Sequence, residues 1–196
     1  MKREDFLWAG DLKSLAYLDE PVLLGGTFQT ISAPHMVVMM LEALELSPGM
    51  SVLEIGTGSG YNAAVMAEIV SRNAILTRPL ITSLEVNNEL VKFASENLNR
   101  AGFEKIVKVI HGDGSLGYPA RSEKETYDRI IVTAATPAIP AFLKAQLKKH
   151  GILLAPVGSR SIQTLVKVRK TWGSLEPKEE KLVECKFVPM IGEDAF

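Results

Sequence analysis

Three glycines alternate with small polar residues in the run Leu53-Glu54-Ile55-Gly56-Thr57-Gly58-Ser59-Gly60. Glycine adopts left-handed backbone angles and lets a ligand approach the main chain closely, and the amides at the start of a following helix then face that ligand. A dinucleotide-binding turn needs its last glycine where this chain has Tyr61. Glu54, just before the first glycine, suits a cationic cofactor better than a pyrophosphate. The run therefore predicts a nucleotide-like cofactor site, with a plain tight turn as the alternative.

Two acidic residues follow later apolar runs. Glu85 comes directly after 80–84, and a carboxylate at such a strand end can accept hydrogen bonds from both hydroxyls of a ribose. Asp113 stands in the turn His111-Gly112-Asp113-Gly114, where it can accept a hydrogen bond from the exocyclic amine of an adenine. The alternatives are an exposed loop acid for Glu85 and an ordinary Asp-Gly turn for Asp113. With the glycine run, these acids predict a cofactor that carries a ribose and an adenine.

Hydroxyl groups gather in Gln29-Thr30-Ile31-Ser32, immediately before a helix predicted over about 33–44. Ser32 can cap that helix, and a serine at a helix start can also hydrogen-bond an anionic group. No His–Asp pair accompanies it, so a nucleophilic serine is disfavoured. His35, on the first helical turn, is expected to pack or to cap. The chain has no Cys/His cluster with ligand spacing, so no metal site is predicted.

The candidate residues must be positioned by the secondary structure around them. Along the chain, short apolar runs alternate with segments of helical periodicity. This alternation predicts an α/β fold with a mostly parallel sheet that helices cover on both faces. The last two strands have no long helix between them, which predicts an antiparallel hairpin at one side. The expected strands are 51–55, 80–84, 106–110, 129–133, 152–156, 164–168 and 182–188, and the expected helices are 33–44, 61–70, 88–101 and 141–149.

The candidate residues all follow the carboxyl ends of successive predicted strands. Gly56–Gly60 comes after the first strand, Glu85 after the second, Asp113 after the third and Ala134–Pro137 after the fourth. In parallel sheets, ligands bind beyond these ends, near the point where the strand order reverses. We therefore expect the candidate residues to meet in one site.

Composition narrows the class of protein. The chain has 196 residues and a net charge of -1, from 22 basic and 23 acidic side chains, so it lacks the basic excess of a nucleic-acid binder. No apolar run approaches the roughly 20 residues that span a bilayer, and no signal-peptide pattern is present. The single cysteine, Cys185, cannot form an intramolecular disulfide and is expected to be buried and inert. We expect a cytoplasmic protein without nucleic-acid or membrane partners. A monomer is expected, with an oligomer as the open alternative, because the sequence does not fix the oligomeric state.

The chain resembles the protein-L-isoaspartate O-methyltransferase family of class I S-adenosylmethionine-dependent enzymes. The glycine run is common to many methyltransferases, whereas the block Ile31–Met36 is far more specific to this family. The matching blocks span about residues 20–192. They are Thr30–Met36, Val52–Asn62, Gly112–Gly114, Tyr127-Asp128, Val132–Pro137, Ile139-Pro140, Pro156–Gly158 and Phe187–Met190.

The resemblance implies a Rossmann-like, doubly wound, mostly parallel seven-stranded sheet with an antiparallel strand near the C-terminus. It implies transfer of the methyl group of S-adenosyl-L-methionine to the free α-carboxylate of L-isoaspartyl residues in damaged proteins and peptides, which leaves S-adenosyl-L-homocysteine. The resulting ester then cyclises to a succinimide, which allows a return to aspartate. Because a carboxylate with a pKa of about 3.9 is already ionised at neutral pH, no general base is needed. Positioning and exclusion of water are left to the protein.

The resemblance also implies a role for each candidate residue. Ser32 is the active-site hydroxyl, and Thr30 and Ile31 line the pocket around the transferred methyl group. The glycine run surrounds the methionine part of the cofactor. In order along the chain, the implied cofactor-binding residues are Thr30, Ile31, Glu54, Gly56, Thr57, Gly58 and Ser59, then Glu85 for the ribose, Val86 beside the adenosine, and Asp113 and Gly114 for the adenine.

The chain departs from the family pattern at its ends and before the second strand. It begins almost at the active-site loop, so we expect the helical N-terminal extension of the family to be largely absent. A single methyltransferase domain is expected, with 1–32 as N-terminal segment and active-site loop and 33–196 as core. Residues 72–79 lack the usual glycine turn, and the chain stops soon after Met190. These departures are expected to affect cofactor enclosure and peptide binding more than the fold.

Alternative functions stay open at this point. One is a methyltransferase that acts on a different carboxylate, which normal and isoaspartyl peptides would distinguish. Another is a non-catalytic module that holds the cofactor or a partner protein, and it predicts cofactor affinity without turnover. A nicotinamide oxidoreductase is disfavoured because the glycine spacing does not fit.

Overall fold

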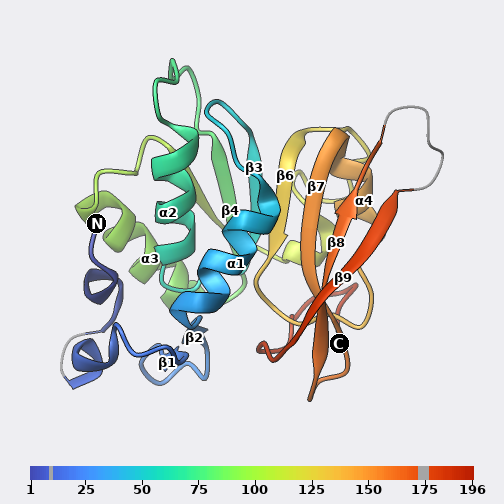
Figure 1. Cartoon of the computed structure of the whole chain (residues 1–196). Helices are drawn as coiled ribbons and strands as arrows, with labels where there is room; N and C mark the ends of the chain where they lie inside the picture. Colours follow the sequence, from blue (N-terminus) through green and yellow to red (C-terminus); the bar gives the residue numbers. More distant parts are fainter. Residues whose placement is uncertain (9–10, 172–176) are drawn as a thin grey trace.

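A seven-stranded sheet forms the centre of the computed structural model, which describes residues 1–8, 11–171 and 177–196 (Figure 1). The strands stand in the order β5-β4-β3-β6-β7-β8-β9. All neighbouring pairs from β5 to β7 are parallel, whereas β8 runs antiparallel to both of its neighbours. The strands are β3 (Val52–Ile55), β4 (Ile81–Glu85), β5 (Val107–His111), β6 (Tyr127–Val132), β7 (Leu147–Gly158), β8 (Gln163–Arg169) and β9 (Lys178–Cys185).

This sheet confirms the predicted α/β, Rossmann-like fold with an antiparallel strand near the C-terminus. The chain builds β3, β4 and β5 outward to one side and then returns to place β6 on the other side of β3. The strand order therefore reverses at β3. The chain leaves β3 toward α2 on one face of the sheet and leaves β6 toward α4 on the other face, and connections that part in this way leave space for a ligand above the two strand ends.

Helices cover both faces of the sheet because its central strands are apolar on both sides. Successive strand residues point to opposite faces, so Val52 packs in one apolar cluster and Leu53 in the other. The first cluster includes residues of α1 (Pro34–Leu44), α2 (Tyr61–Val70) and α3 (Asn88–Arg100), and the second includes residues of α4 (Ala141–Gln146). Within the described ranges, no helix is long and apolar enough to cross a membrane.

The helix predicted over 141–149 is wrong at its end, because α4 stops at Gln146 and β7 begins at Leu147. The Gln146 side chain is fully buried and accepts a hydrogen bond from the amide of Tyr118 at 2.8 Å. Leu147 then pairs with Tyr127 of β6. These partners lie far along the chain, so tertiary contacts override the local helix propensity of the residues that follow.

The last strand lies earlier than the predicted range 182–188, because β9 spans Lys178–Cys185. Its polar half pairs with β8, where Lys167 stands opposite Glu180. An edge strand has a neighbour on one side only and can face solvent, so its residues need not be apolar. Cys185, at the end of β9, is half-buried, and burial raises the pKa of its thiol to about 11.

The N-terminal segment packs against the α2 and α3 side of the core (Figure 1). It contains two 3-10 helices, η1 (Arg3–Phe6) and η2 (Asp11–Leu15), and a hairpin of β1 (Val22–Leu23) and β2 (Thr30–Ile31). Phe6 meets the ring of Tyr61 edge to face at 5.5 Å, and the Trp8 ring stacks on Phe93 with centroids 4.0 Å apart. These aromatic contacts attach the N-terminal segment to the core. The sequence pattern of this segment is too weak to predict its secondary structure.

The turn between β3 and α2 depends on close approach of the backbone to α3. Gly60 has a φ of +83°, and a Cβ atom at this position would lie 3.2 Å from Leu98 and 3.3 Å from the carbonyl oxygen of Ala94. Gly49 has a similar φ of +80°, but nothing lies within 4 Å of its Cβ position. The two glycines therefore share the left-handed conformation and differ in the space around them.

We predict that Gly60→Ala destabilises the protein more than Gly49→Ala. Both substitutions place a side chain at a left-handed backbone position, which costs about 1 kcal/mol. Gly60→Ala adds the repulsion against α3, about 1–3 kcal/mol in a packed core. Urea denaturation would compare the free energies of unfolding. Equal losses in the two variants would contradict the packing argument.

Candidate active site

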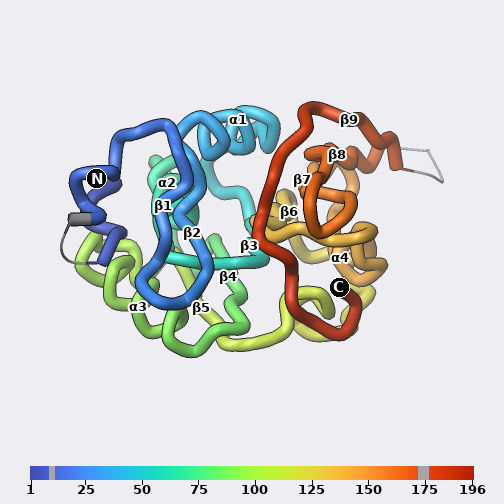
Figure 2. The backbone as a smooth tube through the Cα atoms, turned by 90° about the horizontal axis from the view of Figure 1, so that it is seen from below, coloured from blue at the N-terminus to red at the C-terminus, as the bar shows by residue number. Residues whose placement is uncertain are grey.

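A cavity opens at the carboxyl ends of the central strands. The empty space in it, with the open mouth included, is about 940 Å³. Figure 2, seen from below, shows the N-terminal hairpin and the C-terminal segment on either side of the ends of the central strands. The sequence-predicted residues that line the cavity are Thr30, Ile31, Ser32, Gly56, Thr57, Gly58, Ser59, Glu85, Val86 and Gly114.

The glycine loop forms one wall of this cavity, and its conformation requires glycine. Gly56 and Gly58 have φ values of +97° and +56°. A Cβ atom at Gly56 would lie 2.4 Å from the hydroxyl oxygen of Thr133. That hydroxyl donates a hydrogen bond to the Gly56 carbonyl at 2.6 Å. The Thr133 contact ties the loop to the end of β6, and no role for this threonine follows from the sequence.

The Glu85 carboxylate lies at the end of β4, 6% exposed, and lines the cavity. Its Oε2 accepts a hydrogen bond from the amide of Gly58 at 3.0 Å, and its Oε1 accepts one from the amide of Asn87, also at 3.0 Å. Each carboxylate oxygen can accept two hydrogen bonds, so each keeps one acceptor position. The carboxylate is therefore fixed in place and still able to bind a pair of donors.

Glu54 lies behind the glycine loop and is not part of the cavity lining. It is fully buried, and its carboxylate accepts hydrogen bonds from the Ser83 hydroxyl at 2.5 Å and from the Asn62 amide at 2.8 Å. The Ser83 hydroxyl also lies 2.6 Å from that of Thr57. Burial raises the pKa of Glu54 to about 7, against the lowering effect of these hydrogen bonds. Glu54 thus holds the loop and the start of α2 from beneath.

Asp113 lies next to the cavity, whereas its neighbours Gly112 and Gly114 line it. Its Oδ1 accepts hydrogen bonds from the amide and the hydroxyl of Ser115, at 2.9 and 2.7 Å. Its Oδ2 accepts one from the amide of Glu193 at 2.7 Å. The carboxylate therefore connects the turn after β5 to the C-terminal segment.

The C-terminal segment contributes lining residues that have no predicted role. Ala135, just after β6, donates its amide to the carbonyl of Val188, and its own carbonyl accepts from the amide of Met190, both at 2.7 Å. This pairing places Val188, Pro189, Met190 and Ile191 along the cavity. The block Phe187–Met190 contributes to the family resemblance, but its residues are apolar, so their side-chain chemistry does not predict a place in the cavity.

Ser32 does not cap the following helix, so that prediction is wrong. The helix α1 begins at Pro34, and its N-cap residue, Ala33, makes no side-chain capping bond. Asp19 of the N-terminal segment accepts a hydrogen bond from the amide of His35 at 2.9 Å and from its ring Nδ1 at 2.8 Å. The amide and ring contacts of His35 lower the pKa of Asp19. A residue distant in sequence thus caps α1.

The Ser32 hydroxyl consequently has no hydrogen-bond partner within the described residues. The side chain is half-buried and lines the cavity. A hydroxyl can donate one hydrogen bond and accept two. The cavity is therefore lined by three groups that could bind ligands. They are the fixed Glu85 carboxylate, the open glycine loop, and the Ser32 hydroxyl, which is available to a second ligand. In the described part of the chain, no three His, Cys, Asp or Glu side chains are grouped to hold a metal ion.

Comparison with known proteins identifies the family. The model of the protein-L-isoaspartate(D-aspartate) O-methyltransferase family matches residues 1–195. A protein-L-isoaspartate O-methyltransferase of Staphylothermus marinus is 49% identical over 191 residues, which cover 97% of this chain and 82% of the relative. The corresponding protein of Hyperthermus butylicus is 50% identical over 186 residues, which cover 93% of this chain and 75% of the relative.

Solved structures agree with this assignment. A protein-L-isoaspartate O-methyltransferase structure matches 100% of this chain with a TM-score of 0.83 and 30% identity, and the chain spans 59% of that protein's length. A Plasmodium falciparum β-aspartate methyltransferase in complex with S-adenosyl-L-homocysteine matches with a TM-score of 0.79 and 26% identity, over 96% of this chain and 85% of its own. The chain therefore belongs to the protein-L-isoaspartate(D-aspartate) O-methyltransferase family of S-adenosylmethionine-dependent enzymes.

Proposed function

We propose that this chain transfers the methyl group of S-adenosyl-L-methionine to the free α-carboxylate of L-isoaspartyl residues in proteins and peptides. The observation that carries the proposal is the shared cavity of Ser32 and Glu85. This cavity holds the Ser32 hydroxyl, which has no hydrogen-bond partner among residues 1–8, 11–171 and 177–196, and the fixed Glu85 carboxylate. The two groups can serve two different ligands, an acceptor and a cofactor. Membership of the family supports the choice of substrate and cofactor.

The residues of the cavity fit this cofactor. The two free acceptor positions of Glu85 suit the hydroxyls of a ribose, and Val86 offers an apolar surface beside them. The glycine loop, from Gly56 to Ser59, would hold the methionine part, and Gly114 would meet the adenine. Thr30 and Ile31 would enclose the reacting end. When bound, the cofactor supplies an electrophilic sulfonium methyl group.

Two predicted cofactor ligands would act from behind the cavity wall. Glu54 would hold the glycine loop through Asn62 and Ser83 rather than touch the cofactor. Asp113 would fix the turn that carries Gly114, because Ser115 and Glu193 already engage both of its oxygens. We assign both residues to shaping the site.

The protein's part in the transfer is to orient the acceptor and to exclude water. An isoaspartyl α-carboxylate is ionised at neutral pH, so no side chain has to remove a proton. The Ser32 hydroxyl would donate a hydrogen bond to one carboxylate oxygen and leave the other free to attack. A hydrogen bond to a charged group contributes about 1.5–3 kcal/mol. Alignment of two bound reactants contributes more than any single contact.

We also propose that the whole chain forms one methyltransferase domain that works as a monomer in the cytoplasm and has no nucleic-acid partner. One sheet runs through both apolar clusters, which supports a single domain. The net charge of -1 supports a role away from nucleic acids.

A pair of peptides tests the proposed function. The two peptides differ only in one aspartyl or isoaspartyl linkage, and methyl transfer from labelled S-adenosyl-L-methionine is measured for each. We expect selective methylation of the isoaspartyl peptide. Cofactor binding without transfer to either peptide would overturn the proposed acceptor and favour another carboxylate or a binding role.

We predict that Glu85→Ala weakens binding of S-adenosyl-L-homocysteine at least tenfold, about 1.4 kcal/mol. The substitution removes the proposed ribose acceptor and the clamp on the Gly58 amide. Isothermal titration calorimetry would measure the dissociation constant. Glu89→Ala, at an exposed position on the first turn of α3, is the matched control. An unchanged affinity in Glu85→Ala would exclude the ribose role.

We predict that Ser32→Ala lowers kcat for the isoaspartyl peptide about tenfold or more, because the carboxylate loses its orienting donor. Binding of S-adenosyl-L-homocysteine should change little, since the hydroxyl serves the acceptor. Ser95→Ala, at an exposed site on α3, is the control. Parallel losses of kcat and cofactor affinity would show that Ser32 has only a structural role.

A further inference from the structure

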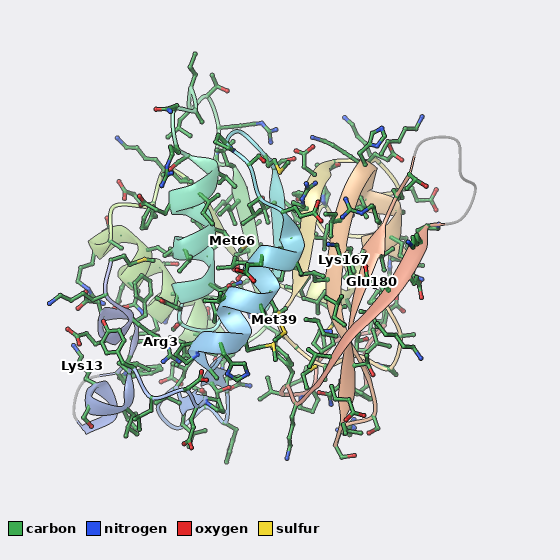
Figure 3. The ribbon with its side chains drawn as sticks, viewed as in Figure 1. Arg3, Lys13, Met39, Met66, Lys167 and Glu180 are labelled. Carbon is green, nitrogen blue, oxygen red and sulfur yellow. The ribbon has the colours of Figure 1, made fainter. Side chains whose placement is uncertain are left out.

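A buried arginine from the start of the chain reaches the backbone of Ser32. Arg3 belongs to η1 and is 2% exposed. Its Nη2 donates a hydrogen bond to the Ser32 carbonyl at 2.7 Å, and its Nη1 donates to the carbonyl of Ala16. Figure 3 shows Arg3 in the N-terminal segment, beside the start of α1. One guanidinium therefore bridges two segments that lie far from it in sequence.

This contact bears on the position of the Ser32 hydroxyl, because that side chain has no bond of its own within the described residues. Its location depends on the backbone to which it is attached. The Ser32 carbonyl is held by Arg3, and the next carbonyl, of Ala33, accepts the amides of Met36 and Val37 at 3.1 Å each. Arg3 and the first turn of α1 thus fix the carbonyl groups of two consecutive peptide units, one on each side of the Ala33 Cα.

Arg3 also contacts the cofactor side of the cavity. Its guanidinium carbon lies 5.8 Å from the centroid of the Tyr61 ring, within the range of a cation–π interaction. Tyr61 is the first residue of α2 and lines the cavity. The same guanidinium therefore contacts the backbone of Ser32, whose hydroxyl is the proposed acceptor-binding group, and the first residue of α2, the helix that follows the glycine loop.

The environment of Arg3 is costly for a residue that only attaches the N-terminal segment. No carboxylate forms an ion pair with it in the described part of the chain, and its Nε is buried without a hydrogen-bond partner. Burying a charge with incomplete hydrogen bonding destabilises a fold, and an apolar side chain of similar size is often at least as stable. An arginine at this position can do what an apolar side chain cannot, which is to donate hydrogen bonds to two backbone carbonyl groups at once.

We propose that Arg3 is a positioning residue for methyl transfer, which acts by fixing the Ser32 backbone so that the Ser32 hydroxyl faces the acceptor carboxylate. This inference rests on the proposed function of Ser32. Arg3 itself is not among the residues that line the cavity. If it acts through Ser32, its removal should slow the transfer step and leave cofactor affinity nearly unchanged.

Variants of Arg3 test this role by separating kcat from binding. We expect Arg3→Met to lower kcat for the isoaspartyl peptide about tenfold while the dissociation constant of S-adenosyl-L-homocysteine stays within about twofold of the wild type. Arg3→Lys keeps the charge but lacks the planar guanidinium that bridges two carbonyls, so its kcat should lie between those of Arg3→Met and the wild type. Lys2→Gln removes a neighbouring charge that forms only an exposed ion pair with Glu4 and should match the wild type.

A double variant tests whether the effect passes through Ser32. If Arg3 acts by placing that hydroxyl, Ser32→Ala with Arg3→Met should have a kcat within about twofold of Ser32→Ala alone, because coupled residues are not additive. Independent, multiplied losses would overturn the proposal. So would a normal kcat in Arg3→Met, or equal losses of kcat and cofactor affinity.

Hydrogen–deuterium exchange of the ligand-free protein tests the positioning without any turnover. Arg3→Met, or Arg3→Lys if the first variant does not fold, should exchange faster over residues 29–33 and keep wild-type protection over α2. Unchanged exchange over 29–33 would contradict the proposal. If the wild type fails to methylate the isoaspartyl peptide, the proposed function fails, whereas this comparison still decides whether Arg3 fixes the Ser32 backbone.

Discussion

The hydrogen bond between the Glu85 carboxylate and the Gly58 amide joins the ends of two neighbouring strands at the point where the site is built. It fixes the glycine loop after β3 relative to the end of β4, and the Thr133 hydroxyl fixes the same loop to the end of β6. A backbone that is held on both sides stays open without a ligand. The glycines are needed because a side chain at Gly56 would occupy the position of Thr133.

Beneath this loop, the protein buries an acid instead of an apolar residue. Glu54 is satisfied by Ser83 and Asn62, which connect β3 to β4 and to α2. A buried carboxyl group costs stability unless its hydrogen bonds are made, and here they secure three elements at once. The raised pKa of Glu54, about 7, shows that burial outweighs the hydrogen bonds. The hydrogen bonds of the buried Glu54 thus fix the position of the glycine loop.

The two ends of the chain complete the cavity from outside the core. The N-terminal segment brings Asp19 to the first turn of α1 and Arg3 to the Ser32 carbonyl. The C-terminal segment pairs with Ala135 and reaches Asp113 through Glu193. Figure 2 shows these ends on opposite sides of the strand ends. The parallel sheet therefore supplies one side of the cavity, and the chain ends supply much of the remaining wall.

Local patterns in the sequence are enough to predict three features: the alternation of strands and helices, the glycine loop, and acids placed directly after strands. Each follows from side-chain periodicity or backbone freedom within a few residues, so Tyr61–Val70 could be predicted as a helix and Glu85 as an acid at the end of a strand. Which side chains meet one another could not be predicted and is seen in the folded chain alone. Asp19 rather than Ser32 caps α1, Glu54 and Asp113 lie behind the cavity wall, and Gln146 ends α4 early. Each of these outcomes depends on a contact between residues that are far apart in the sequence. Such contacts are selected by spatial proximity and burial, which arise only when the chain folds.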